Sequence, residues 1–124
     1  HMSPSVAPLL DVSALERLRA LQDAEEPELL AELTHSFLTR ASQSFQQLRE
    51  LLAEGNLEAF ELRAHSLAGN SGMFGMMRLR EHCLALETLT RGGRLDGAGE
   101  LLAQAEQAFT EARPLLLAML GLPG

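Results

Sequence analysis

Residues 57–75 read LEAFELRAHSLAGNSGMFG, and their spacing predicts a helix over about 57–72. Apolar and small side chains recur there at intervals of three and four residues, at Phe60, Ala64, Leu67 and Ser71. With about 100° of rotation per residue, these positions form one inward stripe. His65 lies roughly 130° from the centre of that stripe, so its imidazole is expected to point into solvent.

The glycines that follow His65 are unusual inside a helix. Gly69 lies one turn beyond His65 and Gly72 two turns beyond it, although glycine in a helix interior costs about 1 kcal/mol relative to alanine. Their effect is to clear side chains from the space around the imidazole, as a docking partner would require. We predict a docking surface comprising Leu62, Ala68, Gly69, Gly72, Met73 and Met76.

The chemistry of an exposed imidazole fits a nucleophile, because its neutral form has a free lone pair. Glu61, four residues before His65, is a candidate to hydrogen-bond the second ring nitrogen. Two other interpretations stay open. A lone exposed histidine is more often merely solvated, and the glycines can instead mark a helix end followed by a loop over 69–75.

Other reactive residues carry weaker signals. His35 and His82 lack small neighbours and are expected to be solvated or half-buried, and Cys83 falls on an inward position as a small core residue. The four histidines show no metal-ligand spacing, so we expect no metal site. The run Gly69-Asn70-Ser71-Gly72 lacks the lysine of a phosphate loop and no strand precedes it, which argues against nucleotide binding.

The rest of the chain is also predicted to be helical, over about 12–22, 26–54, 75–91 and 96–120. Ser13 with Glu16 suggests a capping box, Asp96 suggests an N-cap, and Pro114 should kink or restart the last helix. In the longest helix the expected inward stripe is Leu30, Leu33, Phe37, Ala41, Ser44 and Leu48. Short turns between long helices predict an all-α fold: an antiparallel up-down four-helix bundle with an additional short N-terminal helix.

Length and composition set limits on organisation and partners. The 124 residues suit one domain, over 11–120, preceded by a tag remnant and linker over 1–10. A net charge of −7 disfavours nucleic-acid binding, and no apolar run reaches the ~20 residues that direct membrane insertion needs. The single cysteine, Cys83, fits a reducing compartment, hence a cytoplasmic location. All ten fixed positive side chains are arginines.

The stretch from His65 to Gly75 resembles the signature of the histidine phosphotransfer (HPt) family, roughly H-x-L-K-G-S-S-x-x-x-G. The resemblance continues through Leu79, Cys83 and Leu86-Glu87 to Arg91-Gly92, and it extends over about 11–112. It implies a four-helix bundle in which His65 is the phosphoacceptor and Gly69 provides clearance for docking.

The implied partners are a response-regulator receiver domain, whose aspartate exchanges the phosphoryl group with His65, and a hybrid sensor kinase. The chain would be a carrier in a two-component phosphorelay, without ATP-binding or kinase activity and without a cofactor of its own; Mg²⁺ is expected on the receiver domain. It would act either free-standing or as the cytoplasmic end of a larger sensor kinase.

Ala68 departs from the family pattern, which usually has lysine beside the phosphohistidine. A cation there can stabilise charge on the transferring phosphoryl group. Arg91, at the family's common arginine position, and Arg78 are candidates to replace it. The alternative is a degenerate module that docks receiver or kinase domains without carrying phosphate, and a third is a helical scaffold whose histidine has no role.

Overall fold

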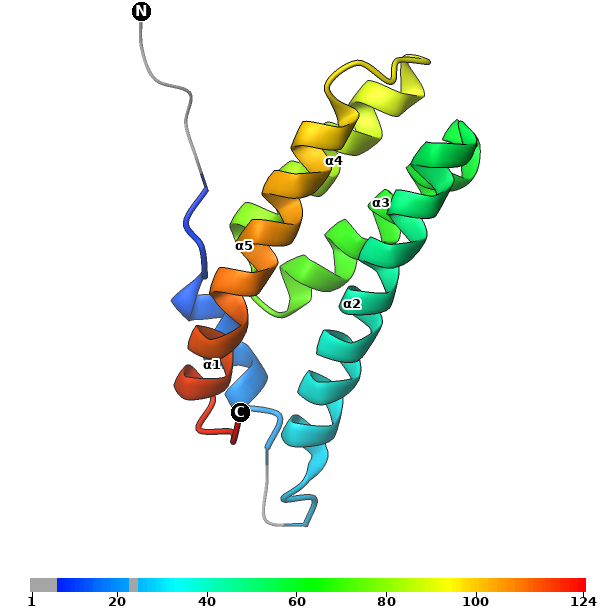
Figure 1. Ribbon diagram of the computed structural model, residues 1–124. Coiled ribbons are helices and arrows are strands. Elements are labelled where there is room, and N and C mark those ends of the chain that lie inside the picture. Colours follow the sequence, from blue (N-terminus) through cyan, green and yellow to red (C-terminus); the bar gives the residue numbers. More distant parts are fainter. Residues whose placement is uncertain (1–6, 23–24) are drawn as a thin grey trace, which may run out of the picture.

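The computed structural model describes residues 7–22 and 25–124, so most of the expected tag remnant and linker lies outside the described residues. This part of the chain contains five α-helices and no β-strand (Figure 1). The all-α expectation is therefore confirmed. The helices are α1 (Val12–Arg19), α2 (Leu29–Glu54), α3 (Leu57–Met73), α4 (Met77–Arg91) and α5 (Ala98–Met119).

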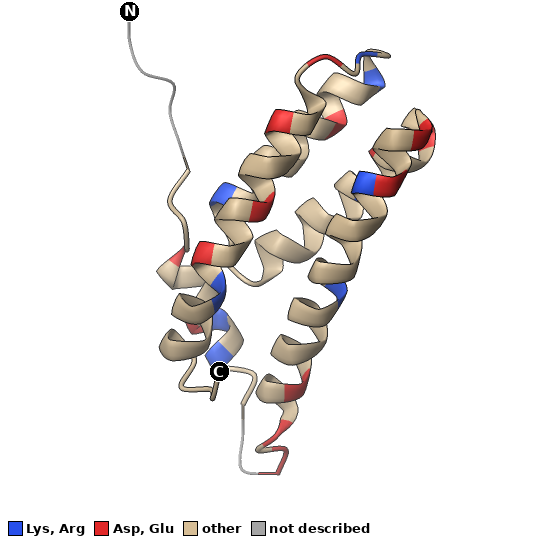
Figure 2. Cartoon of the chain, viewed as in Figure 1, with Lys and Arg blue, Asp and Glu red and all other residues tan. Residues whose placement is uncertain are grey.

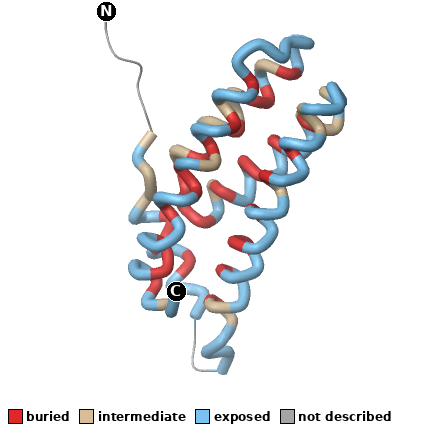
Figure 3. Tube along the Cα trace, viewed as in Figure 1, coloured by how far each residue is buried: buried red, intermediate tan, exposed pale blue. Residues whose placement is uncertain are grey.

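The four longer helices each pack against two others. α3 contacts α2 and α4, and α5 contacts the same two helices. Buried positions line the inner sides of the helices and exposed positions the outer sides (Figure 3). Because every long helix has two neighbours, its buried face is wider than a single stripe.

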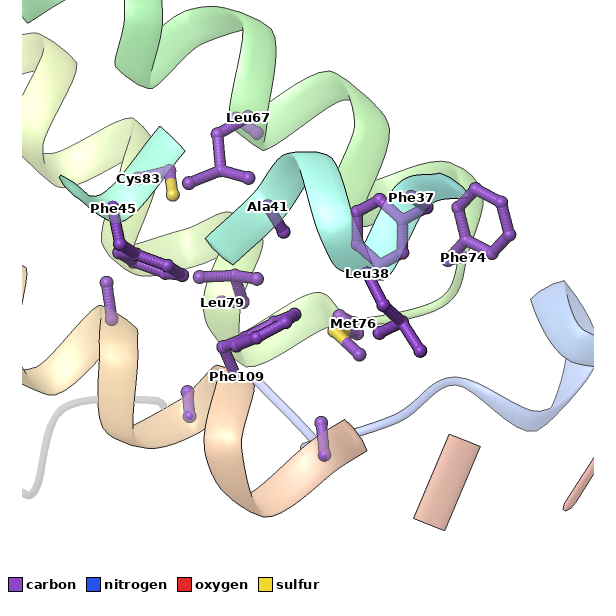
Figure 4. Close-up of a cluster of buried hydrophobic side chains, with 14 of the residues drawn as sticks. Phe37, Leu38, Ala41, Phe45, Leu67, Phe74, Met76, Leu79, Cys83 and Phe109 are labelled. Carbon is purple, nitrogen blue, oxygen red and sulfur yellow. The ribbon is translucent and has the colours of Figure 1, made fainter. Parts of the chain in front are cut away.

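Aromatic pairs mark the middle of the core. The rings of Phe37 and Phe74 stack with centroids 4.4 Å apart, and those of Phe45 and Phe109 meet at 5.6 Å (Figure 4). Each buried phenylalanine contributes about 1.5–3 kcal/mol through the area it removes from water. Phe74 follows α3 directly, so its stacking on α2 fixes where the helix that carries His65 ends.

Helix α2 buries more than the expected stripe. Thr34, Leu38 and Phe45 are buried, whereas Leu33, expected to face inward, is 39% exposed. Leu33 was wrongly expected to face inward, because the face that α2 buries against α3 and α5 instead includes Thr34 and Leu38. The helix also begins at Leu29 rather than at 26, so Pro27 precedes its first turn.

The short helix α1 is held against the turn between α3 and α4. The backbone N–H of Asp11 donates to the carbonyl of Gly75 at 2.8 Å. Gly75 has a φ of +73°, and a Cβ there would lie 3.1 Å from the carbonyl oxygen of Asp11. Only glycine combines this backbone conformation with this close approach.

Three features of the helix ends differ from expectation, and Pro114 does not restart the last helix. Asp11, not Ser13, caps α1, since its carboxylate accepts the N–H of Ser13 at 3.0 Å. Gly97, with a φ of +84°, precedes α5 in place of Asp96. Helix α5 continues through Pro114 without restarting there, and Leu116 and Leu117 just beyond it are buried. Helix α1 ends at Arg19 rather than at 22.

Candidate functional site

His65 projects from the middle of α3, and its side chain is 69% exposed. Its Nδ1 atom lies 3.1 Å from Oε1 and 3.0 Å from Oε2 of Glu87, on the neighbouring helix α4. The side chain of Glu87 is only 10% exposed. The expectation that the imidazole points outward is confirmed, and one edge of the ring is bonded to a buried carboxylate.

The contact with Glu87 assigns the two ring nitrogens different roles. A carboxylate only accepts hydrogen bonds, so Nδ1 of the neutral ring carries the proton, and this N–H donates a hydrogen bond to Glu87. The lone pair then resides on Nε2, which is the nitrogen on the other side of the ring. The arrangement presents a nucleophilic nitrogen in a single tautomer.

Glu61 does not bind His65, contrary to expectation. Its carboxylate accepts a hydrogen bond from Nε of Arg91 at 2.8 Å, across the interface between α3 and α4. The expectation considered α3 alone and therefore missed the arginine that α4 presents to this carboxylate.

Arg91 joins both carboxylates. Its Nη2 donates to Oε2 of Glu87 at 2.5 Å, the same oxygen that lies nearest His65. The hydrogen bond to Glu61 and the negative charges of Glu61 and Glu87 raise the pKa of Arg91. These hydrogen bonds connect four side chains in one network, which we call the His65 network: Glu61, Arg91, Glu87 and His65.

The surface near His65 is open on the side of Gly69. This glycine is exposed, and a Cβ built on it would meet no atom within 4 Å. The helix continues to Met73, so the alternative of a loop over 69–75 is wrong. No packing inside the protein requires glycine at position 69.

Gly72 has a different reason. A Cβ at this position would lie 3.1 Å from Cδ of Arg80, so the missing side chain makes room for an arginine of α4. Packing against Arg80 is thus one reason for glycine at position 72, besides its expected role of clearing space around His65.

The other residues predicted for the docking surface divide into two groups. Leu62 and Met73 are 66% and 61% exposed on α3. Ala68 and Met76, at 2% and 0% exposure, are buried, so their placement on the surface was wrong. Ala68 lies beside the core stripe of a helix that packs on two neighbours, and the turn at Gly75 redirects the chain before Met76.

Arg78 is separated from the site. It stands in the first turn of α4, thirteen residues before Arg91, which is about 20 Å along a helix. Its Nε donates to the carbonyl of Ala7 at 3.2 Å. Arg91 therefore remains a candidate to contact a phosphoryl group on His65, whereas Arg78 is too far along α4 to be one.

The remaining reactive residues do not join this site. His35 is exposed on α2 and His82 is half-buried on α4. Cys83 is buried as expected, and burial raises the pKa of its thiol to about 12. Within residues 7–22 and 25–124, no three histidine, cysteine or acidic side chains are grouped so that they could hold a metal ion.

The role of Glu87 was missed in the sequence, although a signal for it exists. Glu87 lies four residues after Cys83 and next to Leu86, on the inward stripe of α4. Acidic side chains are rarely buried without a partner, so an acid on an apolar stripe indicates a bonded group. The spacing alone could not name His65 as that partner.

Charged positions occur along all the helices, and acidic ones gather where α2 begins (Figure 2). In the view of Figure 2, basic positions are scattered along the helices without forming one continuous patch. None of the described helices is both long enough and apolar enough to span a bilayer.

Known proteins share this architecture. The family model described as Hpt domain matches residues 32–115, whereas a search of curated proteins finds no match. Histidine-containing phosphotransfer protein B from Pseudomonas aeruginosa PAO1 is 30% identical, with a TM-score of 0.83 over 93% of this chain and 96% of that one.

Two plant structures are also similar. The histidine-containing phosphotransfer protein ZmHP2 from maize is 25% identical, with a TM-score of 0.81 over 91% of this chain and 83% of that one. A putative histidine-containing phosphotransfer protein from rice is 23% identical, with a TM-score of 0.80 over 91% and 80% of the two chains, a likeness of fold.

Proposed function

The chain belongs to the Hpt domain family, the histidine phosphotransfer modules of two-component phosphorelays, and on that premise we propose that it carries a phosphoryl group on Nε2 of His65. The pairing of His65 with Glu87 is the observation that carries this proposal. It combines an exposed ring, a fixed tautomer and an open approach past Gly69. The contacts among α2, α3, α4 and α5 also support the expected antiparallel bundle, with α1 as the additional short helix.

The proposed reaction is a direct transfer between two reactive carriers. The lone pair of Nε2 attacks the phosphorus of an acyl phosphate on a receiver-domain aspartate. The Nε2–P bond forms as the P–O bond breaks, and the aspartate leaves as a carboxylate. The ring then bears a positive charge, which the hydrogen bond from Nδ1 to Glu87 stabilises. The reverse reaction returns the group to an aspartate.

Hpt domains interact with receiver and kinase domains. For this chain we propose a response-regulator receiver domain and a hybrid sensor kinase as partners, with Mg²⁺ bound by the receiver and no cofactor on the Hpt chain. Leu62, Met73 and the open surface at Gly69 would contact the receiver. A carrier of this kind supplies position and a nucleophile, and it has no kinase activity of its own. Cytoplasm is the proposed location.

The test is transfer from a panel of phosphorylated receiver domains. Acid-labile label should appear on the intact chain and vanish in His65→Gln, while circular dichroism stays unchanged. His35→Gln is the matched control, because His35 is also exposed on a helix but lies outside the His65 network. Equal labelling of His65→Gln and the intact chain would eliminate His65 as the acceptor.

A second candidate function has its own support. Ala68 provides no cation, and both donor groups of Arg91 in this network face carboxylates. These features favour a module that binds receiver or kinase domains without carrying phosphate. Measurable binding to receivers together with no label on His65 would establish this alternative over the carrier.

A further inference from the structure

The charges around His65 do not favour a phosphoryl group in the resting arrangement. The His65 network contains two carboxylates, Glu61 and Glu87, and one guanidinium, Arg91. A phosphoryl group on a side chain adds about −1.5 to −2 charges near pH 7. The chain has no lysine, so a phosphoryl on His65 must obtain its cation from an arginine, and Arg91 is the one bonded to this network.

Arg91 is engaged before any phosphoryl arrives. Its Nε donates to Glu61 at 2.8 Å, and its Nη2 donates to Glu87. Glu87 binds the Nδ1 edge of the imidazole, so the carboxylate oxygen that Arg91 contacts lies at that edge of the ring. The full charge of Arg91 is present, but it is directed at carboxylates.

The two carboxylates differ in how firmly they hold Arg91. Glu87 is almost buried and is fixed between His65 and Arg91. The pair of Glu61 and Arg91 is nearer to solvent, with side chains 28% and 64% exposed. Exposed ion pairs are weak, while guanidinium groups bind phosphate oxygens strongly through paired donors. The bond to Glu61 is therefore the weaker of the two bonds that hold Arg91.

We propose that Glu61 is a positioning residue that competes with the phosphoryl group for Arg91. In the unphosphorylated chain Glu61 holds the guanidinium. With a phosphoryl on Nε2, Arg91 releases Glu61 and donates to the phosphoryl oxygens, while Glu87 keeps its hold on His65. Glu61 thus lowers the affinity of His65 for the phosphoryl group and favours its release to the next carrier. This inference rests on the proposed function in one respect, that His65 holds the group.

Exchange with a small donor measures this competition without any receiver domain. His65 attacks the phosphorus of protonated N-phosphoimidazole, so the Nε2–P bond forms, the P–N bond of the donor breaks and neutral imidazole leaves. Phosphorus NMR at equilibrium gives the ratio of phosphorylated to free His65. The signal of phosphorylated His65 is assigned by its absence in His65→Gln.

We expect Glu61→Gln to shift this equilibrium toward phosphorylated His65 by roughly two- to fivefold, the range for an exposed ion pair. Glu58→Gln is the matched control, since it removes the same charge one turn earlier in α3 at an exposed position outside the His65 network. Equal constants for Glu61→Gln and Glu58→Gln would overturn the proposal. So would a gain from Glu61→Gln that persists undiminished in an Arg91→Gln background, because the effect would then bypass Arg91.

A second readout follows Arg91 itself. The Nε–H resonance of Arg91 should move when phosphoimidazole labels the intact chain, and in the unphosphorylated Glu61→Gln variant it should already have left its wild-type position. A resonance that stays unchanged on phosphorylation would overturn the exchange. If phosphoimidazole labels His65 while no receiver does, the proposed function fails, and the equilibrium constants still decide the role of Glu61.

Discussion

Nδ1 of His65 lies 3.0 Å from Oε2 of Glu87, which is itself bonded to Arg91. The phosphoacceptor of the proposed relay is thus not an isolated solvated histidine. One nitrogen is fixed by a nearly buried acid, so the other is available to a partner. The alternative of a histidine without a role fits this contact poorly, because burying a carboxylate is unfavourable unless it is bonded.

The contact with Glu87 predicts a graded response to substitution. Glu87→Gln keeps an oxygen that can accept from Nδ1, whereas Glu87→Ala removes the acceptor. We expect Glu87→Ala to mix the two tautomers of His65 and to slow transfer by up to about 100-fold, since small misplacements of a reacting group have effects of that size. Nitrogen NMR of the imidazole reports the tautomers and receiver assays report the rate. A wild-type tautomer ratio in Glu87→Ala would contradict this role.

Substitutions at Gly69 should affect the stability of the domain and its binding to a receiver in different ways. A side chain at this position meets nothing within the protein, so Gly69→Ala should raise the free energy of unfolding by about 0.5–1 kcal/mol through helix propensity. Gly69→Gln should also fold well but weaken receiver binding by occupying the approach to His65. Denaturant titration and binding assays test the two effects. Unaltered receiver affinity in Gly69→Gln would show that the docking surface lies elsewhere.

Adding the missing cation at Ala68 should have two opposite effects. The position is three residues after His65, so the ammonium group of Ala68→Lys can reach the phosphoryl oxygens and speed transfer. Ala68 is buried, and enlarging a packed side chain typically costs about 1–3 kcal/mol. Asn70→Lys, at an exposed position of the same helix, adds equal charge as the control. Faster transfer in both variants alike would indicate a general charge effect.

Cys83 predicts a pH dependence of stability. Burial raises the pKa of the folded thiol from 9.0 to about 12, so the unfolded chain loses this proton first as the pH rises. The free energy of unfolding should therefore be unaffected by this group below pH 9 and should fall between pH 9 and about 12. Denaturant titrations across that range, with Cys83→Ala as the control, measure the difference in slope. Identical slopes for the two proteins would contradict it.

The sequence predicted those features that depend on one helix at a time. The inward stripe of α3 and the outward direction of His65 follow from spacing alone. What it missed depends on contacts between helices. Glu87 and Arg91 reach His65 and Glu61 from α4, and Ala68 is buried because α3 packs on two neighbours. A spacing argument on α3 has no access to these partners.

The most direct test of the central claim is to locate the phosphorus atom on the ring. A chain with ¹⁵N-labelled histidines, phosphorylated by a receiver domain, should give a phosphorus resonance coupled to Nε2 of His65, with Nδ1 still protonated. This result would support both the acceptor and the tautomer that Glu87 selects. Coupling to Nδ1 of His65, or to a nitrogen of His35 or His82, would contradict the account.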